Sequence, residues 1–580
     1  KMKPRVITLD PIRVVYDTRN EALPASTVPL DPSQLARGIG IRYNDFAIQA
    51  QTITGLQSAD DSRNDVVVRG NSPQSVLWRL EGVSLPNPNH FAFPGTSGGP
   101  VAIMNSRMLG NSSFLSGAFP AQFGNTTSGI FYLYFRPGDT TAYIHSVDFG
   151  LLGISAVSEG RLSKRTQSSY LISSRMSTAN MFSALGVDIG IESITRYWDG
   201  TFNFNFPLGG KKGKLPGADG TIKVFGMGGK SDIDIVLSKS ENPFNNIYGE
   251  KDRDQYFGSD MGILGITYNR PLKSEKGQVV MTLAGSGQLI HSYHEFVYPI
   301  DVRNELKAQD GTLSRPDIMP PVQWYEFRES RLSAAYNYST SLKEDTIRTR
   351  RKTYFHAGVT ADVYFIDYRD SARTVDVPIG DEEFGTWRRR WWSDDVFLLI
   401  QPYAQYNLVF SNLNITLGAH SQYLALNNSV SWIEPRIAMR YQLRTDTART
   451  DNERWLTAAI GFHSQMHQPN LYYFGASNNA SGDPISLNRN MGFTRSFHAV
   501  VGFENKVWPG KGESPLRLKA EAYFQYLYNI PVTDTLSSYS LLNTGADFRR
   551  VYLETELVNA GVGYNYGIEV TLEKTFSKGY

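Results

Sequence analysis

Cysteine is absent from this chain of 580 residues, and the chain also lacks long apolar runs and a strong excess of charge. Without cysteine there are no disulfides, no thiolate metal sites and no cysteine nucleophiles. No stretch of about 18 apolar residues occurs, which excludes a membrane-spanning helix. The formal net charge is only +2, so nothing indicates a nucleic-acid partner. The phosphate-binding pattern G-x-x-x-x-G-K-S/T is missing too, and no nucleotide site is expected.

Glycine and aromatic residues are plentiful instead, and beyond about residue 140 apolar side chains recur at every second position. In TFNFNF (201–206), Phe202, Phe204 and Phe206 share one face of an extended chain, opposite Thr and Asn. The same alternation recurs in 456–462, 515–531 and 568–573. Strands of this kind suit a soluble sandwich, whose apolar face packs a core, or a membrane barrel, whose apolar face meets lipid.

Strand length favours the barrel. Strands of soluble proteins have about 5–6 residues, whereas a strand that crosses a bilayer needs about 9–11. Segments such as 277–298, 352–370 and 392–410 are longer, and several end in aromatic residues, as in the interfacial girdles of membrane barrels. Short polar turns also alternate with long loops, which is the arrangement at the two rims of an outer-membrane barrel. We therefore predict an all-β transmembrane barrel.

The first 137 residues have a different pattern, in which short apolar strands are interrupted by glycine. This region resembles the plug domain of TonB-dependent outer-membrane receptors, closely over residues 46–137. The resemblance rests on Val68-Arg69-Gly70, on the turn from Leu77 to Gly82, and on Phe123-Gly124 with Ser128-Gly129. Glu81 stands where the family more often has Asp, and the family's usual Glu-Val-Leu-Arg-Gly-Pro run is replaced. The subgroup that it resembles carries an additional N-terminal carboxypeptidase-regulatory-like domain, which is absent from this sequence.

The resemblance implies a barrel of the 22-stranded class with an N-terminal α+β plug inside its lumen. We divide the chain into a segment with a TonB box (1–17), a plug domain (18–137) and the barrel (138–580). In the family, the TonB box pairs as an added strand with the energy-coupling protein TonB, which needs an exposed extended segment. We assign it to Leu9, Asp10, Pro11, Ile12, Arg13, Val14, Val15 and Tyr16. The alternative is a first plug strand without a coupling role.

Charged residues at the ends of the plug strands are candidates for contacts with the barrel. Arg69 and Arg79 flank apolar strands and are expected to pair with carboxylates that face the lumen, and Glu81 is a third candidate. The alternative is that these groups are ordinary solvated charges at strand ends.

Candidate ligand contacts come from three regions, and each has an alternative interpretation. Asn87, Asn89 and His90 lie in a plug loop that either touches ligand or is braced by the His. The cluster WRRRWW (387–392) includes Trp387 and Arg389, which either anchor the barrel against lipopolysaccharide or recognise an anionic or aromatic ligand. Tyr473 and Phe474 lie in a loop whose aromatic and amide groups suit sugar or peptide contacts.

No catalytic, metal or cofactor site is predicted. GTSGGP (95–100) resembles a serine-protease motif around Ser97, but the only preceding histidine is His90, seven residues away, and no His–Asp arrangement is recognisable. His463 and His467 lie about 13 Å apart along one strand face, too far apart to bind one metal ion. His291 and His294 point to opposite faces of a strand.

The predicted function is TonB-dependent import of a scarce, bulky ligand across the outer membrane of a Gram-negative bacterium. The ligand is a siderophore, an oligosaccharide, cobalamin or a peptide. The resemblance implies TonB, outer-membrane lipid and lipopolysaccharide as partners, together with a surface lipoprotein that caps the barrel. Two other functions remain open at this point: a non-transporting surface receptor or adhesin, and a soluble all-β carbohydrate-active enzyme.

About sixteen alternating segments can be counted, fewer than the 22 strands that the resemblance implies. They lie near 143–151, 154–162, 168–180, 198–208, 220–236, 260–272, 277–298, 327–342, 352–370, 392–410, 412–427, 430–444, 454–466, 492–506, 515–531 and 563–576. We therefore predict that about six C-terminal strands are missing from this sequence. The strands near 143–151 and 563–576 are then expected not to pair with each other.

Overall fold

The computed structural model of the chain describes residues 27–30, 53–58, 64–93, 98–150, 153–178, 194–209, 216–239, 252–272, 277–298, 304, 319–343, 352–373, 375–376, 383–443, 453–478, 484–507, 516–536 and 556–574. The predicted TonB box, Leu9–Tyr16, lies outside these residues. In this described part, no helix has the length and apolar content needed to span a membrane.

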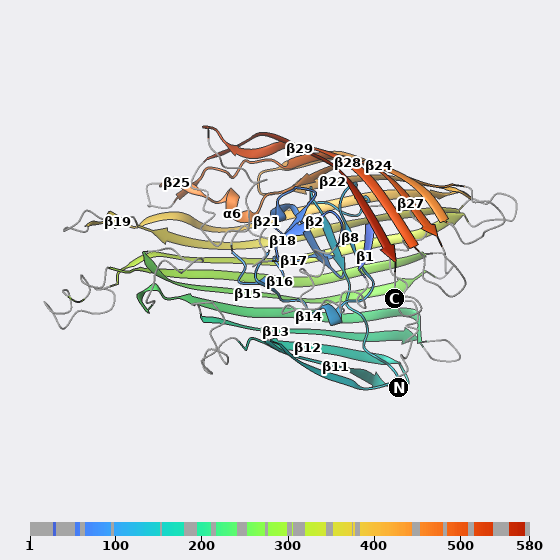
Figure 1. Cartoon of the computed structure of the whole chain (residues 1–580), viewed down its shortest axis with the longest axis horizontal. Helices are drawn as coiled ribbons and strands as arrows, with labels where there is room; N and C mark the ends of the chain where they lie inside the picture. Colours follow the sequence, from blue (N-terminus) through green and yellow to red (C-terminus); the bar gives the residue numbers. More distant parts are fainter. Residues whose placement is uncertain are drawn as a thin grey trace.

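One antiparallel sheet of sixteen strands dominates the molecule (Figure 1). Its strands are β10 (Ile144–Gly150), β11 (Gly153–Ser163), β12 (Ser168–Met176), β13 (Ile194–Gly209), β14 (Pro216–Ile235), β15 (Arg253–Pro271), β16 (Gly277–Phe296), β17 (Pro321–Lys343), β18 (Lys352–Ala372), β21 (Arg388–Val409), β22 (Leu413–Leu424), β23 (Ser429–Gln442), β24 (Glu453–Gln465), β27 (Thr494–Val507), β28 (Leu516–Thr533) and β29 (Leu557–Lys574). Each corresponds to one predicted segment; the largest difference is at β15, which begins at Arg253 rather than at residue 260.

The apolar face of this sheet points away from the plug. Leu264, Val501 and Ile568 are 60%, 58% and 78% exposed on the outside, whereas Asn203 and Gln525, on the inner face, are almost fully buried. A soluble sandwich would bury its apolar face instead. The predicted transmembrane barrel architecture is therefore confirmed. The apolar residues of the alternating pattern face lipid, and the polar residues face the side where the plug lies.

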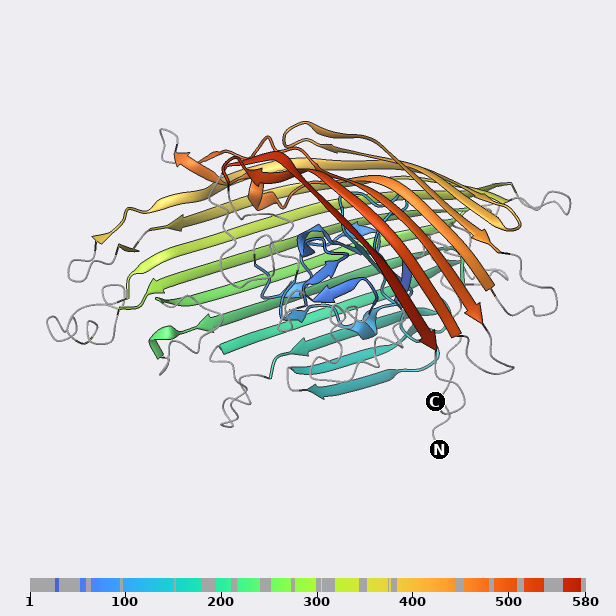
Figure 2. The ribbon, with the colours of Figure 1, turned by 45° about the horizontal axis from the view of Figure 1, so that its top comes forward.

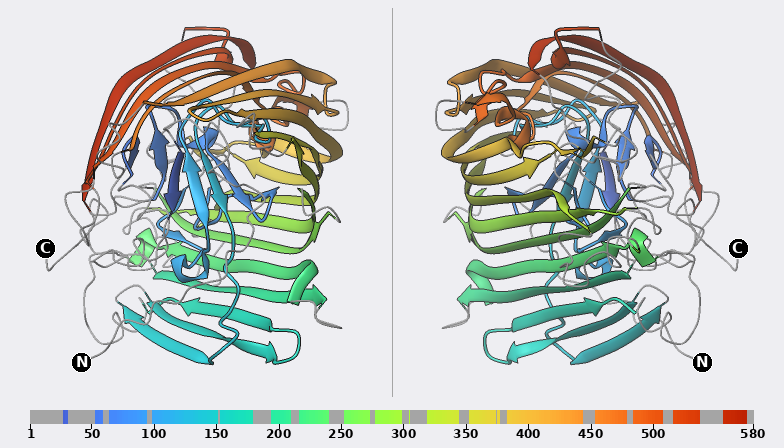
Figure 3. Two further views of the ribbon diagram at one scale, coloured as in Figure 1. Left: turned by 90° about the vertical axis from the view of Figure 1, so that its right-hand side faces the viewer. Right: turned by 90° about the vertical axis from the view of Figure 1, so that its left-hand side faces the viewer.

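The sheet curves around the N-terminal part of the chain and has two free edges, β10 and β29 (Figures 2 and 3). Among the described residues β10 pairs only with β11, and β29 only with β28. The absence of pairing between these two strands agrees with the expectation from the sequence. That further strands complete the barrel remains a prediction.

The plug, drawn in blue in Figure 1, is built on a five-stranded sheet with the order β1-β8-β9-β4-β5. These strands are β1 (Thr27–Leu30), β4 (Leu77–Leu80), β5 (Val83–Ser84), β8 (Ser112–Leu115) and β9 (Ile130–Leu133). Smaller plug elements are β2 (Leu56–Ser58), β3 (Val66–Val68), β6 (Asn89–His90), β7 (Val101–Ala102) and the 3₁₀ turns η1 (Pro73–Ser75) and η2 (Ser106–Met108). Its core contains Val68, Leu80, Phe114, Phe131 and Leu133.

The remaining elements lie in the connections between the long strands. They are η3 (Leu237–Lys239), β19 (Val375–Asp376), β20 (Glu383–Phe384), α6 (Pro469–Tyr472), β25 (Gly475–Asn478) and β26 (Pro484–Ser486). Of these, α6 is important for the site, because it packs against the inner side of the sheet through the hydrogen bond that Trp391 Nε1 donates to the carbonyl of Asn470.

Candidate functional site

Two tight turns of the plug direct charged residues at the barrel wall. The first links β3 to Asn71 through Arg69 and Gly70, and the second links β4 to β5 through Glu81 and Gly82. Both central residues of each turn have positive φ, 49° and 77° in the first and 49° and 95° in the second. This is the type I′ geometry, whose twist matches that of the flanking strands. For Arg69 and Glu81 it costs about 1 kcal/mol each, because side chains with a Cβ disfavour this region.

Arg69 is completely buried between the plug and the last two strands of the sheet. Its guanidinium lies 2.7 Å from a carboxylate oxygen of Glu521 on β28 and 2.8 Å from one of Glu569 on β29, and it stacks 4.4 Å from the ring of Tyr523. Burial acts to lower the pKa of Arg69, but the hydrogen bonds and charges of Glu569 and Glu521 together outweigh it and raise the pKa. The neighbouring Asn71 donates to Gln525, 2.7 Å, and so extends the same contact.

Glu81 and Arg79 contact the opposite side of the wall. Glu81 lies 3.0 Å from the ammonium group of Lys223 on β14 and accepts a hydrogen bond from the backbone N–H of Phe135. Arg79 was expected to pair with a carboxylate of the barrel, but its hydrogen bonds go to uncharged oxygens. It donates to the carbonyls of Gly82 and Gln122 and, at 3.2 Å, to the hydroxyl of Thr360 on β18.

His90 braces the plug instead of facing a ligand. The imidazole is fully buried and its Nε2 lies 3.1 Å from the carboxylate of Asp199 on β13, which also binds Arg175 at 2.8 Å. Arg175 in turn donates to the carbonyl of Ala102 in the plug. The plug is thus held to strands on several sides of the wall, and its connection after β8 is a further example, since Arg436 on β23 donates to the carbonyl of Pro120, 2.7 Å.

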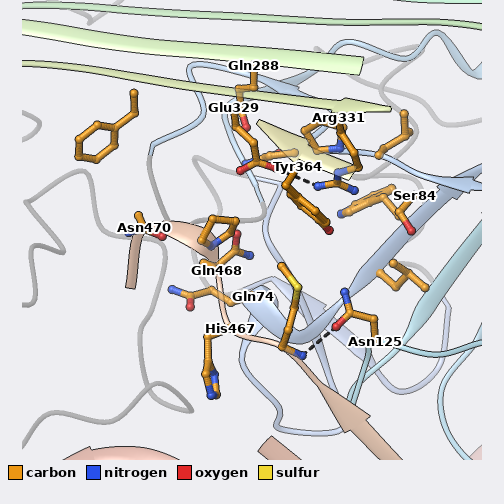
Figure 4. A pocket seen from close by; sticks show the side chains of 18 of the residues that line it. Gln74, Ser84, Asn125, Gln288, Glu329, Arg331, Tyr364, His467, Gln468 and Asn470 are labelled. Carbon is orange, nitrogen blue, oxygen red and sulfur yellow. Dashed lines mark hydrogen bonds and ion pairs between the residues drawn. The ribbon is translucent and has the colours of Figure 1, made fainter. Parts of the chain in front are cut away.

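A cavity lies between the plug, the inner face of β16–β18 and the segment before and within α6 (Figure 4). Its walls combine amide, aromatic and a few charged side chains. It is lined by Gln74, Val76, Leu77, Trp78, Ser84, Leu85, Pro86, Asn87, Phe93, Asn125, Gln288, Ile290, Phe327, Glu329, Arg331, Tyr364, Tyr368, Gln465, Met466, His467, Gln468, Pro469 and Asn470.

Of the seven ligand contacts suggested by the sequence, the cavity contains only Asn87. Asn89 is buried and accepts a hydrogen bond from Asn64, 2.7 Å. Tyr473 and Phe474 are 1% exposed, because the chain after α6 packs them into an aromatic cluster with Trp391.

Trp387 and Arg389 lie away from the cavity, near the start of β21. The guanidinium of Arg373 is 5.1 Å from the ring of Trp387, and that of Arg389 is 4.1 Å from the ring of Trp392. An irregular register between β18 and β21 at this point leaves Arg390 and Trp391 both buried. The cluster is therefore divided between two environments, which a regular alternation does not predict.

Sequence reasoning missed the cavity residues on the strands, above all Glu329 and Arg331 on β17 and Tyr364 and Tyr368 on β18. A signal existed, because these residues occupy every second position on the polar side of long strands. It was not sufficient, since the same parity also selects residues that only contact the plug. Among the described residues, no three His, Asp or Glu side chains converge as metal ligands would.

His467, at the edge of the cavity, makes one pH prediction possible. Its Nε2 donates to the carbonyl of Gly492, 2.8 Å, and burial lowers the pKa of the imidazole to about 4. The unfolded pKa is about 6.5, so the neutral imidazole stabilises this segment fully above that pH, and its contribution decreases as the pH falls toward 4. We expect opening of residues 465–474, measured by hydrogen exchange corrected for intrinsic rates, to increase from pH 7 to 4.5. His467→Gln should remove this dependence, and a pH-independent opening in the parent protein would contradict it.

Solved structures with this architecture are outer-membrane receptors and transporters, and the chain has their fold: a β-barrel wall around an N-terminal plug. A doubly substituted ferric enterobactin receptor from Pseudomonas aeruginosa is 12% identical, with 95% of this chain and 78% of that one covered and a TM-score of 0.60. The outer-membrane transporter YddB from Escherichia coli is 10% identical, with coverages of 96% and 76% and a TM-score of 0.60. The copper transporter OprC is 12% identical, with coverages of 96% and 79% and a TM-score of 0.61. No protein-family profile and no curated protein matches the sequence.

Proposed function

We infer that this protein imports a scarce, bulky ligand across the outer membrane of a Gram-negative bacterium, with energy delivered by TonB. The observation that carries this inference is a plug fixed inside a lipid-facing wall by buried ion pairs, with a cavity lined by both parts. Under this proposal the plug prevents passage through the barrel by diffusion. Passage requires that the plug be moved, and movement requires work from outside the barrel.

The fold similarity to siderophore and copper transporters supports import in general, and the cavity supports a ligand larger than an ion. Under this proposal the ligand binds first at the cavity between plug and strands. TonB then pairs with residues 9–16 and pulls on the N-terminal side of the plug. The anchors at Arg69 and Glu81 hold the plug in place until that force is applied.

Energised accumulation is the property that tests the proposal. Cells producing the protein are incubated with a radiolabelled ferric catecholate, cobalamin, a mixture of neutral oligosaccharides and a capped peptide library. We expect one probe to accumulate above its external concentration, and a protonophore to stop this accumulation while surface binding persists. Binding of a probe without accumulation would indicate a non-transporting receptor or adhesin, and accumulation that is insensitive to the protonophore would also overturn the proposal.

A further inference from the structure

We propose that the cavity between the plug and strands β16–β18 binds a neutral oligosaccharide. This rests on the proposed import function and specifies what the import site recognises. The argument has three parts: the charge of the cavity is balanced internally, three of its free polar groups are carboxamides, and these are combined with the aromatic face of Phe93.

The charged groups of the cavity neutralise each other. Among the described lining residues only Glu329 and Arg331 carry a full charge, and they form an ion pair of 2.9 Å. The guanidinium of Arg331 also lies 4.4 Å from the ring of Tyr364, and the hydroxyl of Tyr368 lies 3.5 Å from Glu329. A strongly anionic metal chelate requires several cations to replace its hydration, because desolvation of an unpaired charge is costly. This lining does not provide them.

Two further arginines, in the region where α6 and the following loop pack on the wall, are paired as well. Arg390 lies 2.6 Å from Asp370, and Arg489 lies 2.6 Å from Asp395. To bind these arginines, an anionic ligand would have to break both ion pairs. The two carboxylates would then lose their partners, and this cost offsets the bonds that the ligand gains.

Carboxamides supply the hydrogen-bonding groups of the cavity. Asn125 accepts from the backbone N–H of Met466, 2.8 Å, so part of the set is used to hold the cavity together. The side chains of Gln74, Gln288 and Gln468 make no hydrogen bond with any described residue. They come from the plug, from β16 and from the residue before α6, and Figure 4 shows Gln288 on the strand side with Gln74 and Gln468 across the cavity.

Each free carboxamide offers one acceptor and two donors. A sugar hydroxyl also donates and accepts. Neighbouring hydroxyls on a sugar ring can therefore accept from the N–H groups of a carboxamide and donate to its oxygen, and no charged group is needed. Phe93 adds an apolar face that is backed by a second ring, since Phe93 stacks on Phe257 at 4.3 Å. The ring of Tyr364 is 2% exposed, because it packs between Phe397, at 4.7 Å, and the guanidinium of Arg331, at 4.4 Å. A peptide shares part of this chemistry, and it is one of the outcomes of the test.

The test uses the full chain in lipid nanodiscs and an array of neutral and acidic oligosaccharides, a ferric catecholate and a capped peptide library. We expect binding to a neutral glycan, with the affinity reduced about tenfold by Gln288→Ala and by Gln468→Ala, as for the loss of a directed hydrogen bond. Gln278→Ala is the matched control, because Gln278 lies on the same strand ten residues away, about 33 Å. The Gln278→Ala variant should bind the glycan with unchanged affinity.

Several outcomes would overturn the inference. They are binding to no neutral glycan, glycan binding that is insensitive to both cavity variants, and cavity-dependent binding of the ferric catecholate or of a peptide. The uptake assay separates this inference from the import function. Energised accumulation of the ferric catecholate refutes the ligand class alone, whereas cavity-dependent glycan binding without energised accumulation refutes import alone.

Discussion

Replacing Arg69 by Ala is expected to destabilise docking of the plug by about 3–5 kcal/mol, the cost of breaking a buried ion pair from one side. The variant leaves the Glu521 carboxylate, which is 2% exposed, without its cation. Glu569, at 14% exposure, loses its cation too. Hydrogen exchange of the amides around β3 is the measurement, because docking on β28 and β29 protects this hairpin. The expected result is faster exchange in this hairpin, by two orders of magnitude or more on the same free-energy scale.

Two further variants give this prediction its controls. Arg107→Ala removes another plug–wall ion pair, with Asp148, but both side chains are about a quarter exposed, and the expected loss is below about 1 kcal/mol. The triple variant Arg69→Met, Glu521→Gln, Glu569→Gln removes both buried charges together with their partner and should recover much of the stability. Exchange in Arg69→Ala no faster than in Arg107→Ala would show that the buried cluster does not hold the plug.

Deleting residues 9–16 is expected to abolish accumulation of ligand completely and to leave surface binding unchanged. The sequence of this segment is a β-prone run in a Pro-rich polar surrounding, which suits pairing as an added strand with TonB. The cavity residues and the anchors of the plug are far away in the sequence. Uptake and surface binding are measured in the same cells, together with the yield of protein in the outer membrane.

A pair of point variants tests whether strand pairing is the reason. Val14→Pro removes a backbone donor and should reduce uptake as strongly as the deletion, because proline cannot donate in a β-ladder. Val14→Thr retains both the donor and the β-propensity, and should transport normally. If Val14→Pro transports as well as Val14→Thr, then this segment has no coupling role.

Much of the wall could be predicted from the sequence, because the environment of a barrel residue depends on local parity. Along a strand, the residues of one parity face lipid and those of the other face the interior of the barrel, so the faces of Phe202, Ile568 and Glu569 could be assigned from position alone. The position of the two charged turn residues could also be predicted from the local sequence. Arg69 and Glu81 each precede a glycine in a tight turn between apolar strands, which places them on the surface of the plug.

The partners of these residues could not be predicted, since they are set by how the chain closes on itself. His90 meets Asp199, 109 positions later, and Arg69 meets Glu521 and Glu569, about 450 and 500 positions later. A loop histidine looks the same in a sequence whether it reaches a ligand or a buried carboxylate. The burial of Tyr473 and Phe474 could not be predicted either, because it follows from the packing of α6 against Trp391.

The sequence by itself therefore determined the strands and their two faces, since these depend on patterns within a few consecutive residues, and it indicated the plug through its resemblance to a known family over residues 46–137. The tertiary structure alone decided the cavity and its chemistry. Gln74, Gln288, Arg331 and Gln468 lie on four separate segments, and they form one site only because the curved sheet brings its inner face against the plug and the α6 segment. Burial, and hence the balance of charge around a ligand, depends on that closure and not on any single stretch of chain.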